Sequence, residues 1–105
     1  MDKIEAIDAV KRFSAAIRST YEPLMVILYG SYASGKQTLS SDIDVAVVVD
    51  RIEGDFLDQE AGLYRTRREI DDRIAPILVE AGNDPSGFAH TIMSTGEVIY
   101  ERKTD

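Results

Sequence analysis

The chain has 105 residues, of which 44% are hydrophobic and 30% charged, and its formal net charge is −7. An acidic chain argues against nucleic acid as the main partner, because phosphate backbones bind basic surfaces. The absence of cysteine excludes disulfides, thiolate metal sites and a cysteine nucleophile. With no signal-peptide pattern and no apolar run near the about 20 residues of a membrane span, we expect a cytoplasmic protein. The length predicts a single domain over residues 1–105.

The first half of the chain predicts one helix and two strands. Apolar residues at spacings of three and four predict an amphipathic helix over residues 3–19, with an inner face of Ile4, Ile7, Val10, Phe13 (or Ser14) and Ile17. Pro23 ends any continuation, and LMVILY (24–29) predicts a buried strand. SDIDVAVVVD (41–50) predicts a second strand.

The second half predicts two more helices and two more strands. A long amphipathic helix is expected over residues 56–73, and PILVE (76–80) predicts a strand, because a leading proline suits a strand's first residue. Asp84 is the expected N-cap of a short helix with Pro85 at its first position, closed by Gly96. EVIYE (97–101) predicts the last strand. This order of elements indicates an α/β or α+β domain.

The segment LYGSYASGKQ (28–37) has the outline of a phosphate-binding P-loop, because Gly30, Gly35 and Lys36 have the required spacing. Gln37, however, stands where the Ser or Thr that contacts magnesium should be. The next strand begins near Asp42, which leaves no room for a crossover of at least about 10–12 residues with its helix. The loop is therefore expected to bind phosphate in another way.

Two carboxylates follow this loop on one face of the next strand. Asp42 and Asp44 are two residues apart, so they point the same way about 6.5–7 Å apart along the strand. Such a pair can hold divalent cations that also bind substrate phosphates. Gly30 allows the backbone to approach a phosphate closely, and Ser31 offers its hydroxyl and backbone N–H groups. Together these residues predict a phosphoryl-transfer site.

Gly30-Ser31, then ten residues, then Asp42-Ile43-Asp44 form the pattern G-S-x10-D-x-D between two strands. This pattern resembles the signature of the DNA polymerase β-like nucleotidyltransferases, in particular the minimal nucleotidyltransferases (MNT proteins). The resemblance implies a small mixed sheet of about four strands flanked by helices. It also implies that Asp42 and Asp44 are catalytic and bind one or two Mg²⁺ ions, and that Gly30 and Ser31 hold the triphosphate of ATP.

The resemblance also implies a third carboxylate on a later strand, and here the matching position is Ala75. The other acids nearby are Glu80, at the far end of that strand, and Asp71 and Asp72 on the preceding helix. With two carboxylates the site can still hold one Mg²⁺ with a nucleotide's phosphates. It would activate an attacking hydroxyl less well.

MNT proteins are commonly antitoxins of helical HEPN-domain proteins, which are often ribonuclease toxins, and can transfer AMP from ATP to a tyrosine of that partner. The resemblance therefore implies Mg²⁺-dependent transfer of AMP to a HEPN-type toxin, and an acidic chain suits a basic partner. Two alternatives stay open. One is a catalytically weak nucleotide-binding relative that neutralises its partner by binding, and the other is transfer to a small molecule such as an aminoglycoside. Association with further copies of the chain also stays open.

The remaining polar residues have simpler interpretations. Lys36 is expected at a charged loop tip. His90 is expected either on the surface or with its ring hydrogen-bonded within the protein. Arg65, Arg67 and Arg68 are expected on the solvated face of a helix.

Overall fold

The computed structural model describes residues 1–103. Its elements are, in chain order, α1 (Lys3–Tyr21), β1 (Met25–Tyr29), α2 (Ser31–Ser34), β2 (Ile43–Val49), α3 (Phe56–Arg67), β3 (Ile74–Glu80), α4 (Phe88–Thr95) and β4 (Glu97–Glu101). Every predicted helix and strand is present, and α2 is a single turn inside the glycine loop. None of the helices within residues 1–103 has the length and apolar character needed to cross a membrane.

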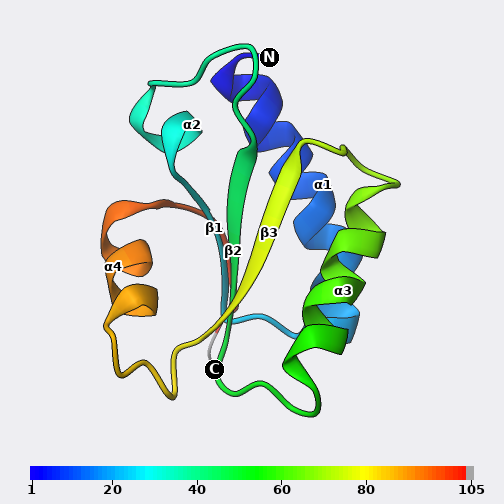
Figure 1. Cartoon of the computed structure of the whole chain (residues 1–105), viewed down its shortest axis with the longest axis vertical. Helices are drawn as coiled ribbons and strands as arrows, with labels where there is room; N and C mark the ends of the chain where they lie inside the picture. Colours follow the sequence, from blue (N-terminus) through cyan, green and yellow to red (C-terminus); the bar gives the residue numbers. More distant parts are fainter. Residues whose placement is uncertain (104–105) are drawn as a thin grey trace.

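The four strands form one sheet in the order β3-β2-β1-β4. Strand β1 is antiparallel to both β2 and β4, whereas β2 and β3 are parallel and are connected through α3. Helices α1 and α3 cover one face of the sheet and α4 lies on the other (Figure 1). The mixed four-stranded sheet flanked by helices is thus confirmed.

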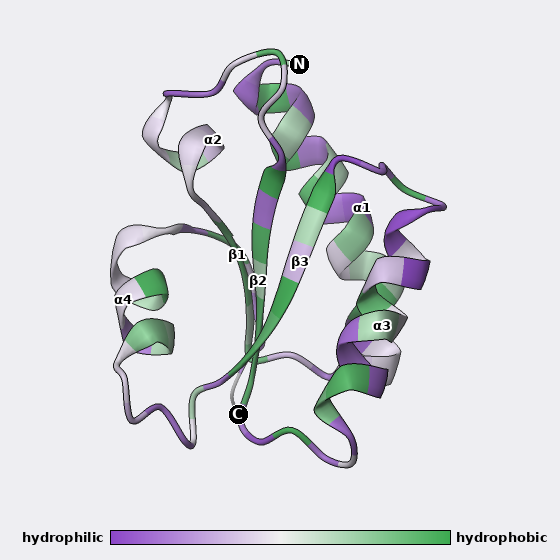
Figure 2. Ribbon diagram, in the orientation of Figure 1, coloured by the Kyte–Doolittle hydropathy of each residue, from purple (hydrophilic) through white to green (hydrophobic). Residues whose placement is uncertain are grey.

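The core has two parts, one on each face of the sheet. The larger part joins α1 and α3 to the sheet, and its buried strand residues are Val26, Leu28, Ile43, Val45, Val47, Val49, Ile74 and Leu78. The smaller part lies under α4 and contains Ile27, Ala46, Val48 and Ile92. The hydrophobic colour accordingly runs along the strands, whereas the loops at both ends of the sheet are mostly hydrophilic (Figure 2). Strand β2 is almost wholly apolar because it is central and covered on both faces.

The predicted inner face of α1 was wrong at its first position. Ile4 is 79% exposed, whereas the buried residues are Ala6, Ala9, Val10, Phe13, Ser14 and Ile17. The small side chains of Ala6 and Ala9 allow the first turns of the helix to lie close to the sheet. A pattern of large apolar residues alone does not reveal this.

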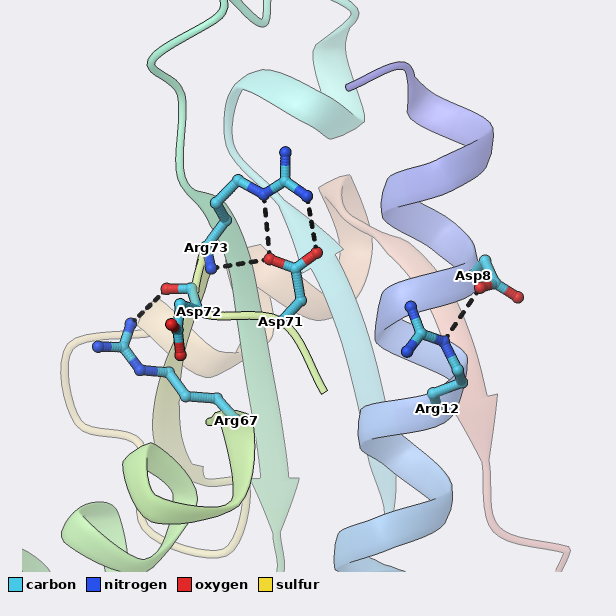
Figure 3. A network of polar contacts seen from close by, with 6 residues as sticks. All are labelled: Asp8, Arg12, Arg67, Asp71, Asp72 and Arg73. Atoms are coloured by element: carbon cyan, nitrogen blue, oxygen red, sulfur yellow. Dashed lines mark hydrogen bonds and ion pairs between the residues drawn. The ribbon is translucent and has the colours of Figure 1, made fainter. Parts of the chain in front are cut away.

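Helix α3 ends at Arg67, six residues before the predicted end. The Arg67 guanidinium donates to the backbone carbonyls of Asp72 and Ile74, at 2.9 and 2.8 Å. In the same turn Asp71 accepts three hydrogen bonds from Arg73, one from its backbone N–H and two from its guanidinium (Figure 3). These contacts stabilise a turn over residues 68–73. The turn contains no glycine or proline from which it could have been predicted.

Strand β3 consequently begins at Ile74, two residues earlier than predicted, and Pro76 lies inside it. Proline is tolerated there because β3 is an edge strand of the sheet. Ala75 therefore belongs to the paired part of the strand.

The start of α4 also differs from the prediction. Gly87 is the N-cap residue and Pro85 lies in the turn before the helix. Asp84 lies before the N-cap position in the sequence but still caps the helix. Its carboxylate accepts hydrogen bonds from the backbone N–H groups of Ala89 and His90, both at 3.0 Å. These bonds lower the pKa of Asp84. Gly96 ends the helix as predicted.

Candidate functional site

The end of β1, the start of β2 and the start of β3 meet at one edge of the sheet. Tyr29 pairs with Asp44 across the antiparallel strands β1 and β2. Ala75 pairs with Asp44 across the parallel strands β2 and β3. Tyr29, Asp44 and Ala75 thus form one row across three strands. Because side chains alternate along a strand, Asp44 lies on the face of Ala46 and Val48, which is the α4 face.

The glycine loop lies directly against Asp44. Gly30 has φ 74° and ψ −148°, a conformation that side chains rarely adopt. A Cβ atom at Gly30 would overlap the Oδ2 atom of Asp44 and would lie 3.1 Å from its Cγ. Position 30 therefore needs glycine for both its backbone angles and its space. The two halves of the sequence pattern are in contact.

The two carboxylates at this edge affect one another. Asp42 is exposed and lies just before β2, whereas Asp44 is half-buried. The pKa of Asp44 is raised, first by its burial and then by the negative charge of Asp42. Ile43, between them, is fully buried on the opposite face, as predicted. A divalent cation between the carboxylates would remove this repulsion.

Ser31 starts α2 immediately beyond Gly30 and is half-buried. Its backbone carbonyl accepts hydrogen bonds from the N–H of Lys36 at 2.9 Å and from the Ser34 hydroxyl at 3.2 Å, which closes the loop into a tight turn. The Ser31 hydroxyl itself makes no hydrogen bond within residues 1–103. Lys36 is exposed, as expected for a loop tip.

The sequence profile of the family described as "Polymerase beta, Nucleotidyltransferase" matches residues 12–105. The chain belongs to this polymerase β-like nucleotidyltransferase family. A crystal structure of a candidate nucleotidyltransferase from Sulfolobus solfataricus has a similar fold, with a TM-score of 0.72 and 22% sequence identity. The similarity covers 95% of this chain and 84% of that chain. No curated protein matches the sequence significantly.

Polymerase β-like nucleotidyltransferases act on nucleotides and generally use a divalent metal. The residues at this edge fit one such cation, because the carboxylates of Asp42 and Asp44 lie close enough for the charge of one to act on the other. Among residues 1–103 no group of three or more acidic or histidine side chains could hold a metal ion. Further ligands for a cation would have to come from water or from the phosphates of a nucleotide.

The nearby acids do not complete the site as a third carboxylate of the family would. Glu80 pairs with Val49, five residues beyond Asp44, which is about 16 Å along the strand. Its carboxylate accepts a hydrogen bond from the backbone N–H of Ile52 at 2.9 Å. Asp71 is bound on both oxygens by Arg73, and this pairing lowers its pKa.

The other residues noted in the sequence lie away from this edge or are exposed. His90 is exposed on α4, Arg65 is exposed on α3, and Arg68 is exposed at the C-cap of α3, as expected for solvated residues. Arg67 is different, because it is half-buried, bonds the start of β3 and lies over the ring of Tyr64 with its Cζ 4.7 Å from the ring centre. Its interpretation as part of a solvated face was wrong.

Sequence reasoning missed Tyr29. This residue is half-buried next to Asp44, and its pKa is raised to about 12, first by burial and then by the charges of Asp44, Tyr64 and Glu60. The only sequence signal was that Tyr29 directly precedes Gly30, because its place beside Asp44 on the α4 face depends on the pairing of β1 with β2.

A cavity of roughly 310 Å³ lies at the other end of the sheet, where β2 ends. It is lined by residues that include Tyr21, Asp50, Arg51, Gln59 and Arg102. None of the residues in the pattern G-S-x10-D-x-D contributes to it. The candidate nucleotide site lies instead at the edge that carries Gly30, Asp42 and Asp44.

Proposed function

We propose that this protein is a Mg²⁺-dependent nucleotidyltransferase of the MNT type, which transfers AMP from ATP to a tyrosine hydroxyl of a HEPN-type toxin and acts as its antitoxin. The observation that carries the proposal is the contact between Gly30 and Asp44. A phosphate that approaches the bare backbone at Gly30 lies beside the carboxylates that would hold a cation. The net charge of −7 supports a basic, RNA-cleaving partner.

The chemistry assigned to each residue follows from its position. Gly30 and Ser31 bind the phosphates, and the free Ser31 hydroxyl supplies a donor. Asp42 and Asp44 would hold Mg²⁺, which would neutralise charge on the phosphates. The acceptor oxygen then forms a bond to the α-phosphorus, the bond from the α-phosphorus to the β-phosphate oxygen breaks, and pyrophosphate leaves. The hydroxyl proton passes to water.

A second function is favoured by a specific observation, the pairing of Ala75 with Asp44. With alanine there, no third carboxylate helps to lower the pKa of the attacking hydroxyl. The missing carboxylate should therefore lower the rate of the chemical step more than the affinity for the nucleotide. In this second function the protein binds nucleotide, transfers it slowly if at all, and neutralises its partner by binding.

Restoring a carboxylate at position 75 tests both functions. Radiolabelled ATP and Mg²⁺ are incubated with a purified HEPN-type protein from the same genome and with the parent, Ala75→Asp or Ala75→Ser. Ala75 is half-exposed beside Asp44, so both side chains have room. We expect Ala75→Asp to raise the rate of labelling about tenfold, equivalent to about 1.4 kcal/mol of barrier, and Ala75→Ser to leave it unchanged.

The other outcomes separate the two functions. Rapid labelling by the parent that Ala75→Asp slows would show that the chemistry does not need the third carboxylate. Complex formation without labelling by any variant would favour the binding function. Absence of MgATP binding by the parent would contradict both.

A further inference from the structure

Tyr29 lies one residue inward from the glycine loop, on the face that carries the two carboxylates. It is the last residue of β1, and its pairing with Asp44 places the two side chains next to each other. On the far side of Asp44 the row ends in Ala75, whose side chain is a single methyl group. The space above this row is therefore bordered by one large aromatic residue, one carboxylate and one small residue.

The hydroxyl of Tyr29 has no hydrogen-bond partner within residues 1–103. This hydroxyl is not fully buried, so solvent reaches it. The hydroxyl of Tyr21, which is also half-buried, instead donates to the backbone carbonyl of Gln59 at 2.7 Å. The Tyr29 hydroxyl is thus a free donor next to the candidate metal ligands.

The surroundings of Tyr29 combine apolar surface with negative charge. On the same face, Ile77 and Val79 of β3 are half-buried and pack against the smaller core. Asp44 and Glu60 are the acidic groups close enough to act on the phenol. An uncharged polar group of a ligand suits these surroundings better than another anion.

The order of residues along β1 places the backbone of Tyr29 relative to a bound nucleotide. Phosphates held at Gly30 and Ser31 would lie at the outer edge of the sheet, and Asp42 and Asp44 would hold the cation. Tyr29 is one residue, about 3.3 Å, further inward. The sugar is attached directly to the α-phosphate, so it is the part of the nucleotide that comes next on this side.

We infer that the Tyr29 hydroxyl donates a hydrogen bond to a ribose hydroxyl of the bound nucleotide, and so favours a nucleotide over a bare polyphosphate. This inference rests on the proposed nucleotide site and adds a residue that recognises the sugar. Tyr29 would be a binding residue for the nucleoside part, whereas Gly30, Ser31 and the two aspartates bind the triphosphate and its metal.

Calorimetry with three ligands tests the inference. MgATP, Mg²⁺ with 2′,3′-dideoxy-ATP, and Mg²⁺ with tripolyphosphate are titrated into the parent, Tyr29→Phe and Tyr21→Phe. We expect Tyr29→Phe to weaken MgATP binding about 3- to 10-fold, the range of one hydrogen bond, and to leave tripolyphosphate binding unchanged. Dideoxy-ATP should bind the parent as weakly as ATP binds Tyr29→Phe, and should lose nothing more in the variant.

The matched control is Tyr21→Phe, at the other end of the sheet. It should lower the melting temperature, because the Gln59 carbonyl loses its donor, and should leave all three affinities unchanged. Tyr29→Phe should show the reverse, with an unchanged melting temperature. An equal loss of ATP and tripolyphosphate affinity in Tyr29→Phe would overturn the assignment to ribose, as would no loss of either. If the parent does not bind Mg²⁺ with tripolyphosphate, the proposed site itself is wrong and the inference is wrong with it.

Discussion

The two ends of the sheet differ in how their polar groups are satisfied. At the end where β2 finishes, Glu80 accepts from the Ile52 N–H, the Tyr21 hydroxyl donates to Gln59, and the Arg102 guanidinium donates to the Pro23 carbonyl. At the end where β2 begins, Asp42 and Asp44 form no ion pair with any residue of 1–103. Their charges repel each other instead. The polar groups named at the first end are therefore bonded within the protein. The two carboxylates at the second end are not, and they can bind a ligand.

This difference shows why the shape of the surface alone does not identify the site. The cavity of roughly 310 Å³ belongs to the satisfied end, and several of its lining groups already have partners within the protein. At the edge with Gly30 and Asp44, the side chains of Asp42, Asp44, Ser31 and Tyr29 form no hydrogen bond or ion pair within residues 1–103. Such groups are the better guide to chemistry, because they can bind a ligand without first breaking an internal hydrogen bond.

The largest expected effect comes from placing a side chain between the glycine loop and Asp44. Gly30→Ala would force the Asp44 carboxylate to move and would strain the backbone by about 1–3 kcal/mol. We expect MgATP binding, measured by calorimetry, to fall below detection, together with a lower free energy of unfolding measured in urea.

The control for this variant is Gly35→Ala in the same loop. Gly35 also has a positive φ, of 77°, but a Cβ atom there would meet nothing within 4 Å. Its backbone strain, about 1–2 kcal/mol, should lower stability without abolishing nucleotide binding. Equal binding losses in both variants would mean that loop conformation matters and that contact with Asp44 does not.

Much of the fold was predictable because it depends on local periodicity. The apolar run of β2 and the spacing of Val10, Phe13 and Ile17 in α1 are properties of short segments. The end of α3 was not predictable, because the Arg67 guanidinium must reach the carbonyl of Ile74, seven residues later, before the turn is stable. Such a contact has no pattern in the sequence.

The candidate site was also predictable only in part. The spacing of Gly30, Asp42 and Asp44 indicated which residues to consider, because residues two apart in a strand share a face. Their contact, and the place of Tyr29 beside them, depend on the pairing register of β1 with β2. Register is a property of the assembled sheet, so a single sequence read along its length did not reveal it.

A smaller effect is expected within the glycine loop. Ser31→Ala removes the free hydroxyl at the edge, and we expect MgATP affinity to fall about 3- to 10-fold, as for the loss of one hydrogen bond. Lys36→Ala, at the exposed loop tip, should change the affinity little. Calorimetry on both variants decides the point. A loss with Lys36→Ala and none with Ser31→Ala would mean that the loop binds phosphate as a P-loop does.

The smallest effect is expected at the satisfied end of the sheet. Glu80→Ala leaves the Ile52 N–H without its acceptor and should lower the free energy of unfolding by about 1 kcal/mol. Nucleotide binding and transfer should be unchanged, because Glu80 lies far from Asp44 along the strands. Loss of transfer in this variant would instead identify Glu80 as the third carboxylate and would remove the distinction between the two ends.

The most direct test of the account is the binding of MgATP to Asp44→Asn. The raised pKa of Asp44 means that ionisation of this carboxyl, which is complete at neutral pH in the unfolded chain, lowers the stability of the folded protein. At pH 7 without metal, the uncharged variant should therefore melt at the same temperature as the parent or higher. Its Mg²⁺-dependent binding of ATP, measured by calorimetry, should be lost, because a cation ligand is gone. A stable Asp44→Asn variant that binds MgATP as tightly as the parent would contradict the assignment of this edge as the nucleotide site.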